Sequence, residues 1–154
     1  GPVSIRYPRG CADAPGTGET QLLDVGRALK VREGADAALL AWGRPVQAAL
    51  MAAEELAREG VSCAVYDMRW AKPIDAEAVR EAAACGALIT LEEGSIIGGA
   101  GSGVLELLAA EGLTPRVRTM GLPDEFVMQG DTSLLLEDVG LDTPSICAAV
   151  RDLL

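Results

Sequence analysis

Two adjacent glutamates and a glycine-rich turn make up the stretch of this sequence whose residue types could do chemistry. Glu92 and Glu93 follow the apolar run 87–91, and Gly98-Gly-Ala-Gly-Ser-Gly103 comes soon after them. A strand, a glycine-rich turn and a helix start can hold an anion, because free backbone N–H groups point outward there. The turn lacks the third glycine of a dinucleotide fingerprint and the Lys-Ser or Lys-Thr of a P-loop. An anion site and a close backbone approach that needs glycine both remain open.

Neighbouring residues on a strand point to opposite sides, so Glu92 and Glu93 make a poor acid–base pair. Either one of them bonds the glycine-turn amides or a partner chain, or both lie in solvent at a strand end.

A second candidate site lies near the start of the chain, where Arg6 and Arg9 bracket a Tyr-Pro pair. A guanidinium held by a stiff turn suits bidentate phosphate binding.

The composition excludes several functional classes. The chain has 154 residues, a formal net charge of −10 and no histidine. This charge argues against a nucleic-acid partner and against an anionic membrane surface, and no apolar run is long enough for a membrane helix. The four cysteines are scattered, so a zinc site has few ligands, and the commonest general base is missing. We expect no metal site, no catalytic residue in this chain, and the reduced thiols of a cytoplasmic protein.

Strand patterns alternate with helix patterns along most of the chain, which predicts an α/β domain with a mostly parallel sheet. Strands are predicted at 28–33, 37–42, 63–66, 87–91 and 116–120. Helices are predicted at about 45–60, 75–85, 102–112 and 132–139, and from 144 onward, with Asp75 and Ser102 as caps. An isolated strand at 3–7 followed by a Gly- and Ala-rich linker indicates the end of a preceding domain.

Six segments, taken in order, resemble a known family. They are Arg6-Tyr-Pro-Arg-Gly10, Asp67-Met-Arg-Trp-Ala-Lys-Pro-Ile-Asp75, Thr90-Leu-Glu-Glu93, Gly98-Gly-Ala-Gly-Ser-Gly103, Gly121-Leu-Pro-Asp124 and Gly140-Leu-Asp142. Together they resemble the C-terminal transketolase-like domain of 1-deoxy-D-xylulose 5-phosphate synthases, over almost the whole chain. The pyruvate dehydrogenase beta subunit and transketolase share this domain but match the segments less well.

The resemblance implies a fold and a domain layout. The fold is a three-layer α/β/α domain whose five-stranded, mostly parallel sheet carries one antiparallel edge strand. The layout places the tail of a pyrimidine-binding domain at 1–10, a linker at 11–26 and the C-terminal domain at 27–154.

The family enzyme joins pyruvate to D-glyceraldehyde 3-phosphate with loss of carbon dioxide, using thiamine diphosphate and magnesium. It is a homodimer that supplies isoprenoid, thiamine and pyridoxal synthesis. The domains that bind its cofactor are absent here, so we expect this chain alone to be inactive and to bind no cofactor. The resemblance also implies that Arg9, with Arg6 as a second candidate, binds the phosphate of glyceraldehyde 3-phosphate.

We expect this chain to act as a scaffold that joins subunits. The candidate interface residues lie in the glutamate pair, the glycine turn and the loop at 121–130; they are Glu92, Glu93, Gly98, Gly99, Gly101, Asp124 and Phe126. Two alternatives remain open: the C-terminal domain of a pyruvate dehydrogenase beta-like enzyme, and a stand-alone module that binds an anion or nucleotide at the strand ends.

Overall fold

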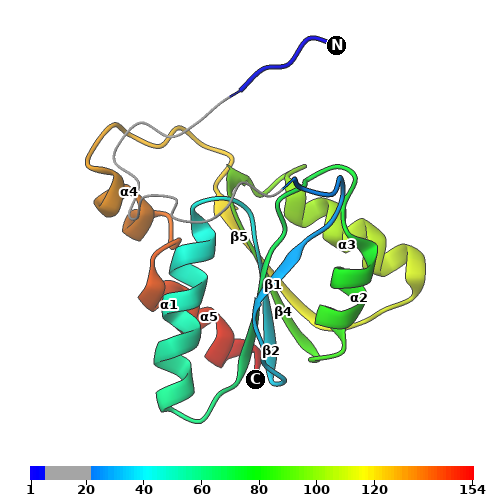
Figure 1. Ribbon diagram of the computed structural model, residues 1–154. Helices are drawn as coiled ribbons and strands as arrows, with labels where there is room; N and C mark the ends of the chain where they lie inside the picture. The colour runs from blue at the N-terminus through cyan, green and yellow to red at the C-terminus, as the bar shows by residue number, and fades with distance from the viewer. Residues whose placement is uncertain (6–21) are drawn as a thin grey trace.

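The computed structural model describes residues 1–5 and 22–154, and the second range forms a five-stranded sheet covered by helices (Figure 1). The strand order is β1-β3-β2-β4-β5. The strands are β1 (Leu29–Arg32), β2 (Ala37–Ala41), β3 (Cys63–Asp67), β4 (Ala87–Ser95) and β5 (Arg116–Leu122). The helices are α1 (Pro45–Arg58), α2 (Ala76–Ala83), α3 (Ala100–Glu111), α4 (Thr132–Asp138) and α5 (Thr143–Leu153).

The strand directions confirm the predicted sheet. β3, β2, β4 and β5 run parallel to one another, and β1 alone runs antiparallel, with Leu29 opposite Asp67 on β3. The central strand β2 is fully buried, as expected for a parallel strand covered on both faces. β1 and β5 form the two edges of the sheet.

The sheet separates two apolar clusters, which gives three layers. On one face, α1 and α5 pack against strand residues such as Leu39 and Ile89. On the other, α2 and α3 pack against residues such as Leu40 and Leu88. Figure 1 shows these two helix pairs on opposite sides of the sheet. Alternate residues of one strand point to opposite faces, so each buried strand contributes side chains to both clusters.

The antiparallel edge strand is fixed to α2 by ion pairs and by one buried carboxylate. The ammonium of Lys30 lies 2.6 Å from the carboxylates of Glu33 and Glu81. Asp75 accepts hydrogen bonds from the backbone N–H groups of residues 28, 77 and 78, at 2.9 to 3.1 Å. The predicted Asp75 cap is therefore confirmed, and the same side chain also holds the chain just before β1.

Three local predictions differ from the structure. In the predicted strand 3–7, the described residues 3–5 are exposed and form no strand, in keeping with the need of a strand for a pairing partner. β4 continues past Leu91 to Ser95, because it resumes pairing with β5 beyond a register shift. α5 begins at Thr143 rather than Pro144, because Asp142 accepts a hydrogen bond from the N–H of Ser145.

Candidate functional site

The carboxylate of Glu92 occupies the N-terminus of α3. Its two oxygens accept hydrogen bonds from the backbone N–H groups of Ala100, at 2.9 Å, and Gly101, at 2.8 Å. These are the first two amides of the helix, which have no partner within it. Glu92 is only 7% exposed. The prediction that one glutamate bonds the glycine-turn amides is confirmed for Glu92.

Four glycines make room for this side chain. A β-carbon on Gly94 would lie 2.8 Å from a Glu92 carboxylate oxygen, and one on Gly99 would lie 2.5 Å from the other oxygen. On Gly101 it would lie 3.4 Å from Oε1, and on Gly121 it would lie 3.1 Å from Cγ. Contacts under about 3.4 Å are tighter than most real β-carbons make. Glycines that allow a close approach were predicted here, and the approaching groups are the Glu92 side chain, the carbonyl oxygens of Gly94 and Ser95, and the Thr90 hydroxyl.

The predicted Ser102 cap is wrong. Ser102 lies inside the first turn of α3, and its hydroxyl donates to the carbonyl of Ile96 at 3.2 Å. It also accepts from the N–H of Gly98 at 3.1 Å. Ser102 therefore closes the turn before the helix, while the more distant Glu92 satisfies the helix amides.

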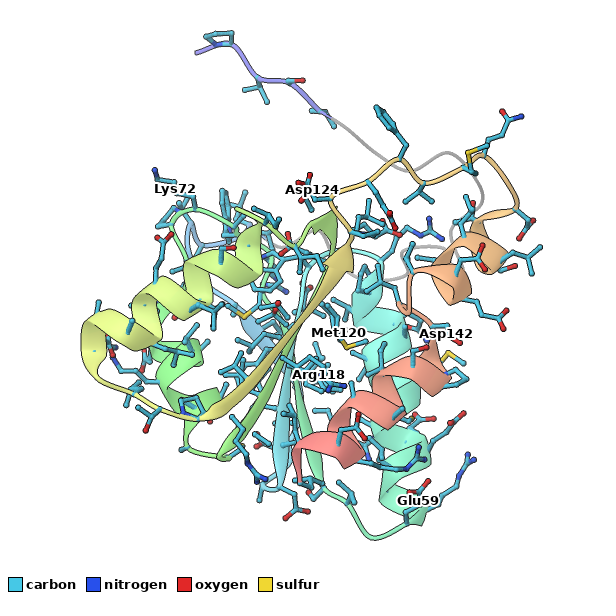
Figure 2. All side chains as sticks on the ribbon, turned by 180° about the vertical axis from the view of Figure 1, so that it is seen from behind. Glu59, Lys72, Arg118, Met120, Asp124 and Asp142 are labelled. Atoms are coloured by element: carbon cyan, nitrogen blue, oxygen red, sulfur yellow. The ribbon has the colours of Figure 1, made fainter. Side chains whose placement is uncertain are left out.

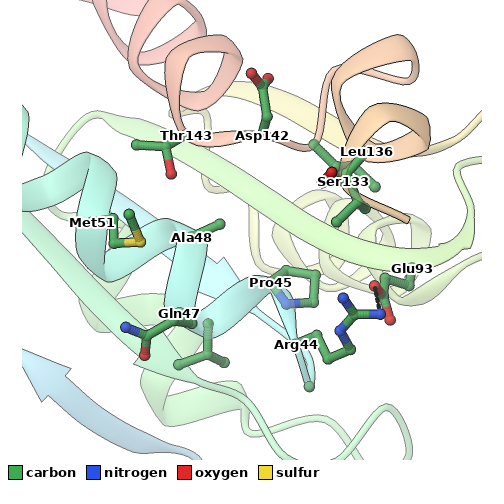
Figure 3. Close-up of a pocket in the computed structure, with 13 residues that line it drawn as sticks. Arg44, Pro45, Gln47, Ala48, Met51, Glu93, Ser133, Leu136, Asp142 and Thr143 are labelled. Carbon is green, nitrogen blue, oxygen red and sulfur yellow. Dashed lines mark ion pairs between the residues drawn. The ribbon is translucent and has the colours of Figure 1, made fainter. Parts of the chain in front are cut away.

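Glu93 points away from Glu92, as adjacent strand residues do. Its carboxylate lies 3.5 Å from the guanidinium of Arg44, at one end of a hollow of about 490 Å³ (Figure 3). The N-terminal part of α1 forms one wall, including Met51, and Ser133 and Leu136 of α4 form another (Figure 3).

A second, more apolar hollow of about 360 Å³ shares Glu93 and Leu136 with the first. Its other lining residues come from the end of β5, the loop 123–131 and α4. Beside it, Phe126 is fully exposed, Met128 is 78% exposed and Leu134 is 60% exposed. We call Phe126, Val127, Met128 and Leu134 the β5–α4 apolar surface. Figure 2 shows Asp124 at the end of the molecule where β5 finishes, and Glu59 at the opposite end.

The described thiols are poor nucleophiles. Burial raises the pKa of Cys63 to about 11, with the nearby Asp36 carboxylate adding to the effect. Burial also raises the pKa of Cys85 and of Cys147. With a raised pKa these thiols stay protonated near neutral pH. Because a thiol is a nucleophile only as the thiolate, they react poorly. All three are free cysteines.

The predicted site residues fall into three groups. Glu92 and Gly101 are buried in the turn with the half-buried Gly99 beside them, whereas Glu93, Gly98, Asp124 and Phe126 are at least partly accessible on the same end of the sheet. Arg6 and Arg9 lie outside the described residues, so their role stays a prediction.

Sequence reasoning missed four residues of this region: Arg44, Thr90, Gly94 and Gly121. Gly94 and Gly121 lie within β4 and β5, and a glycine inside a strand often marks a close approach by another group. That signal was present in the sequence. Arg44 and Thr90 carried no comparable signal.

Within residues 1–5 and 22–154, no three His, Cys, Asp or Glu side chains form a group that could hold a metal ion. Among the described helices, none is both long and apolar enough to span a bilayer.

Comparison with known proteins places this architecture in one family. The model of the transketolase C-terminal domain matches residues 26–146. A 1-deoxy-D-xylulose-5-phosphate synthase of Bordetella parapertussis is 47% identical over 154 residues, covering 98% of this chain and 24% of that protein. The synthases of Aquifex aeolicus and Magnetococcus marinus are 41% and 40% identical, each over 99% of this chain.

A solved structure titled as a split-gene transketolase in an inactive β4 tetramer has the same fold, with a TM-score of 0.80 and 39% identity. The match covers 85% of this chain and 43% of that one. The chain spans about a quarter of the length of the curated relatives it matches. On the family model and on these identities, the chain belongs to the transketolase C-terminal domain family.

Proposed function

We propose that this chain is the C-terminal domain of a 1-deoxy-D-xylulose-5-phosphate synthase. The observation that carries the proposal is 40–47% identity to such synthases over nearly the whole chain. The full enzyme would join pyruvate to D-glyceraldehyde 3-phosphate, release carbon dioxide, and supply isoprenoid, thiamine and pyridoxal synthesis in the cytoplasm. Its cofactors would be thiamine diphosphate and magnesium.

The described residues do not fit the cofactor themselves. No metal-binding group is found among them, and Glu92 already occupies the two free amides at the start of α3. In the full enzyme the cofactor would therefore bind to the rest of the polypeptide. Arg9, with Arg6, is proposed to bind the phosphate of glyceraldehyde 3-phosphate.

The proposed role of the domain itself is contact between subunits of a homodimer. The β5–α4 apolar surface, which lies beside the two hollows, supports this role, because large apolar patches mark interaction sites. The split-gene transketolase, described as a β4 tetramer, also supports self-association. Glu93, Gly98, Asp124 and Phe126 would make contacts, while Glu92, Gly99 and Gly101 would hold the turn from inside.

An activity assay tests the enzyme assignment. The full-length gene product, supplied with thiamine diphosphate, magnesium, pyruvate and glyceraldehyde 3-phosphate, should release carbon dioxide and form the five-carbon product. The 154-residue chain should release none. Carbon dioxide release by the short chain, or a full-length enzyme that accepts only ketose donors, would overturn the proposal.

Substitutions in the full-length enzyme test the two residue assignments. Arg9→Ala should raise KM for glyceraldehyde 3-phosphate and leave KM for pyruvate unchanged, with Arg58→Ala on α1 as the control.

Phe126→Ser should weaken the dimer at least about tenfold by sedimentation, as expected for a buried aromatic contact. Leu29→Ser, at the far edge of the sheet, is its control. Equal effects of Phe126→Ser and Leu29→Ser would remove the interface assignment.

A further inference from the structure

The turn between β4 and α3 has the parts of an anion-binding site, and a side chain of the same chain already fills it. The Glu92 carboxylate accepts a hydrogen bond from a different helix amide at each of its two oxygens. The helix has twelve residues, so its N-terminal amides carry the partial positive charge that favours an anion. Glycines 94, 99, 101 and 121 surround the side chain.

A second observation points to the same place. Thr90 is fully buried, and its hydroxyl has no hydrogen-bond partner among the described residues. That hydroxyl oxygen is the nearest heavy atom, at 2.5 Å, to the point where a β-carbon on Gly101 would lie. A buried hydroxyl without a partner is rare in folded proteins. Here it lies next to the helix amides that hold the carboxylate.

We propose that this turn is a carboxylate-binding site whose resident ligand is Glu92, and that it will bind free formate or acetate when that side chain is removed. The site suits a carboxylate because each of its two oxygens receives one amide N–H. A small free anion is not tied to β4, so it is able to shift toward the Thr90 hydroxyl. The wild-type chain binds no added carboxylate or phosphate at the turn, since Glu92 is already there.

The first test is rescue of Glu92→Ala in the 154-residue chain. The truncation leaves two helix amides without a partner and an empty space of carboxylate size. Formate at about ten times its dissociation constant should raise the ratio of folded to unfolded Glu92→Ala chain about tenfold, relative to chloride at equal ionic strength. The rescue should saturate, and acetate should act more weakly because of its methyl group.

Two matched variants keep the test specific. Glu93→Ala removes the neighbouring carboxylate, and formate should stabilise it no more than the wild-type chain. In Glu92→Gln the side chain still fills the turn but has lost its charge. Formate should therefore not increase the folding stability of this variant. Equal gains in Glu92→Ala, Glu92→Gln and Glu93→Ala would show a general salt effect and overturn the proposal.

Amide resonances identify the site directly. Formate should shift the N–H signals of Ala100 and Gly101 in Glu92→Ala but not in the wild-type chain, where inorganic phosphate should also leave them unchanged. Adding Thr90→Val to Glu92→Ala should weaken formate binding. If Glu92→Ala does not fold in chloride, refolding in formate takes the place of the melting curve. Failure to fold in both salts, or unshifted Ala100 and Gly101 signals, would overturn the proposal.

Discussion

The helices α2 and α3 cover the same face of the sheet, and each begins at a buried carboxylate, but the two carboxylates come from different distances along the chain. Asp75 is the residue directly before α2 and bonds amides two and three residues ahead. Glu92 comes from β4 and bonds amides eight and nine residues ahead. The comparison shows that a helix start can be satisfied locally or by a carboxylate from another element.

The two carboxylates also fix opposite edges of the sheet. Asp75 accepts from the N–H of Ala28 just before β1, and the Glu92 side chain lies over Gly121 of β5. Asp75 and Glu92 are the two buried carboxylates of the described chain. Each one therefore joins a helix start to an edge strand, which is a tertiary role as well as a capping role.

Removing the distant carboxylate should have the larger effect. Glu92→Ala should lower the free energy of unfolding by about 3 kcal/mol, because it leaves two helix amides unpaired in a closed site. Urea denaturation measures this loss. Glu93→Ala is the control, because the accessible Arg44 pair should contribute about 0.5 kcal/mol. Similar losses in both variants would mean that the buried hydrogen bonds add little.

Removing the local carboxylate should cost somewhat less. Asp75→Ala should lower the free energy of unfolding by about 2 kcal/mol, the upper end for a lost helix cap, because the Ala28 contact is lost as well. Hydrogen exchange should show faster opening of β1 in this variant and little change at β5. The reverse pattern is expected for Glu92→Ala, and a pattern shared by both variants would contradict the link to separate edges.

The contribution of Asp75 should depend on pH. Burial alone would raise its pKa, but hydrogen bonds from the N–H groups of Ala28 and Ala78, the Arg27 charge and the N–H of Glu77 together lower it. A carboxyl whose pKa is lowered by folding stabilises the protein fully above its unfolded pKa of about 3.9 and loses this contribution as the pH falls further. The stability gap between wild type and Asp75→Asn should therefore narrow below about pH 4. A gap that stays constant down to pH 2 would contradict this.

Two glycines of α3 should respond to alanine with opposite signs. A β-carbon on Gly101 would lie 2.5 Å from the Thr90 hydroxyl and 3.1 Å from Thr119, so Gly101→Ala should destabilise by about 2 kcal/mol. Apart from its chain neighbours and the backbone of its own helix, no described atom lies within 4 Å of the same point on Gly103. Gly103→Ala should therefore stabilise by about 1 kcal/mol through helix propensity. Thermal denaturation compares the two, and equal signs would contradict the packing around Glu92.

The smallest expected effect is at Thr90. Thr90→Val keeps the side-chain shape and removes a buried hydroxyl that has no partner in the described chain. It should raise the free energy of unfolding by about 1 kcal/mol, since no hydrogen bond is lost and a desolvated polar group is removed. A loss of stability on chemical denaturation would show that the hydroxyl has a partner, such as water.

The sequence identified the local carboxylate as a cap directly, whereas it left bonding of a glutamate to the glycine-turn amides as one of several alternatives and assigned the cap of the next helix to Ser102. Asp75 directly precedes an apolar helical pattern, which is the usual sign of a cap. Glu92 reaches α3 across a turn whose path depends on the register shift between β4 and β5. The nearer Ser102 has the right residue type for a cap, so local reasoning selected it.

Most of the fold followed from hydrophobic patterns, because five strands and five helices have distinct periods and are punctuated by glycine and proline. The extension of β4 through Glu92, Glu93 and Gly94 did not follow, because two charged residues and a glycine are unusual in a strand. The Arg44–Glu93 pair and the hollow around it also depend on how α1 and α4 pack, which no local pattern encodes.

The two outer strands of the sheet affect how copies of this chain can meet. β1 carries Lys30 and Arg32, and β5 carries Arg116 and Arg118; of these, Lys30 and Arg118 are paired with carboxylates of the same chain. Positive side chains along an outer strand oppose edge-to-edge growth into longer sheets, since a second strand would bring like charges together. We therefore expect subunits to associate through loops and helices, and the domain to resist fibre-like aggregation even at high concentration.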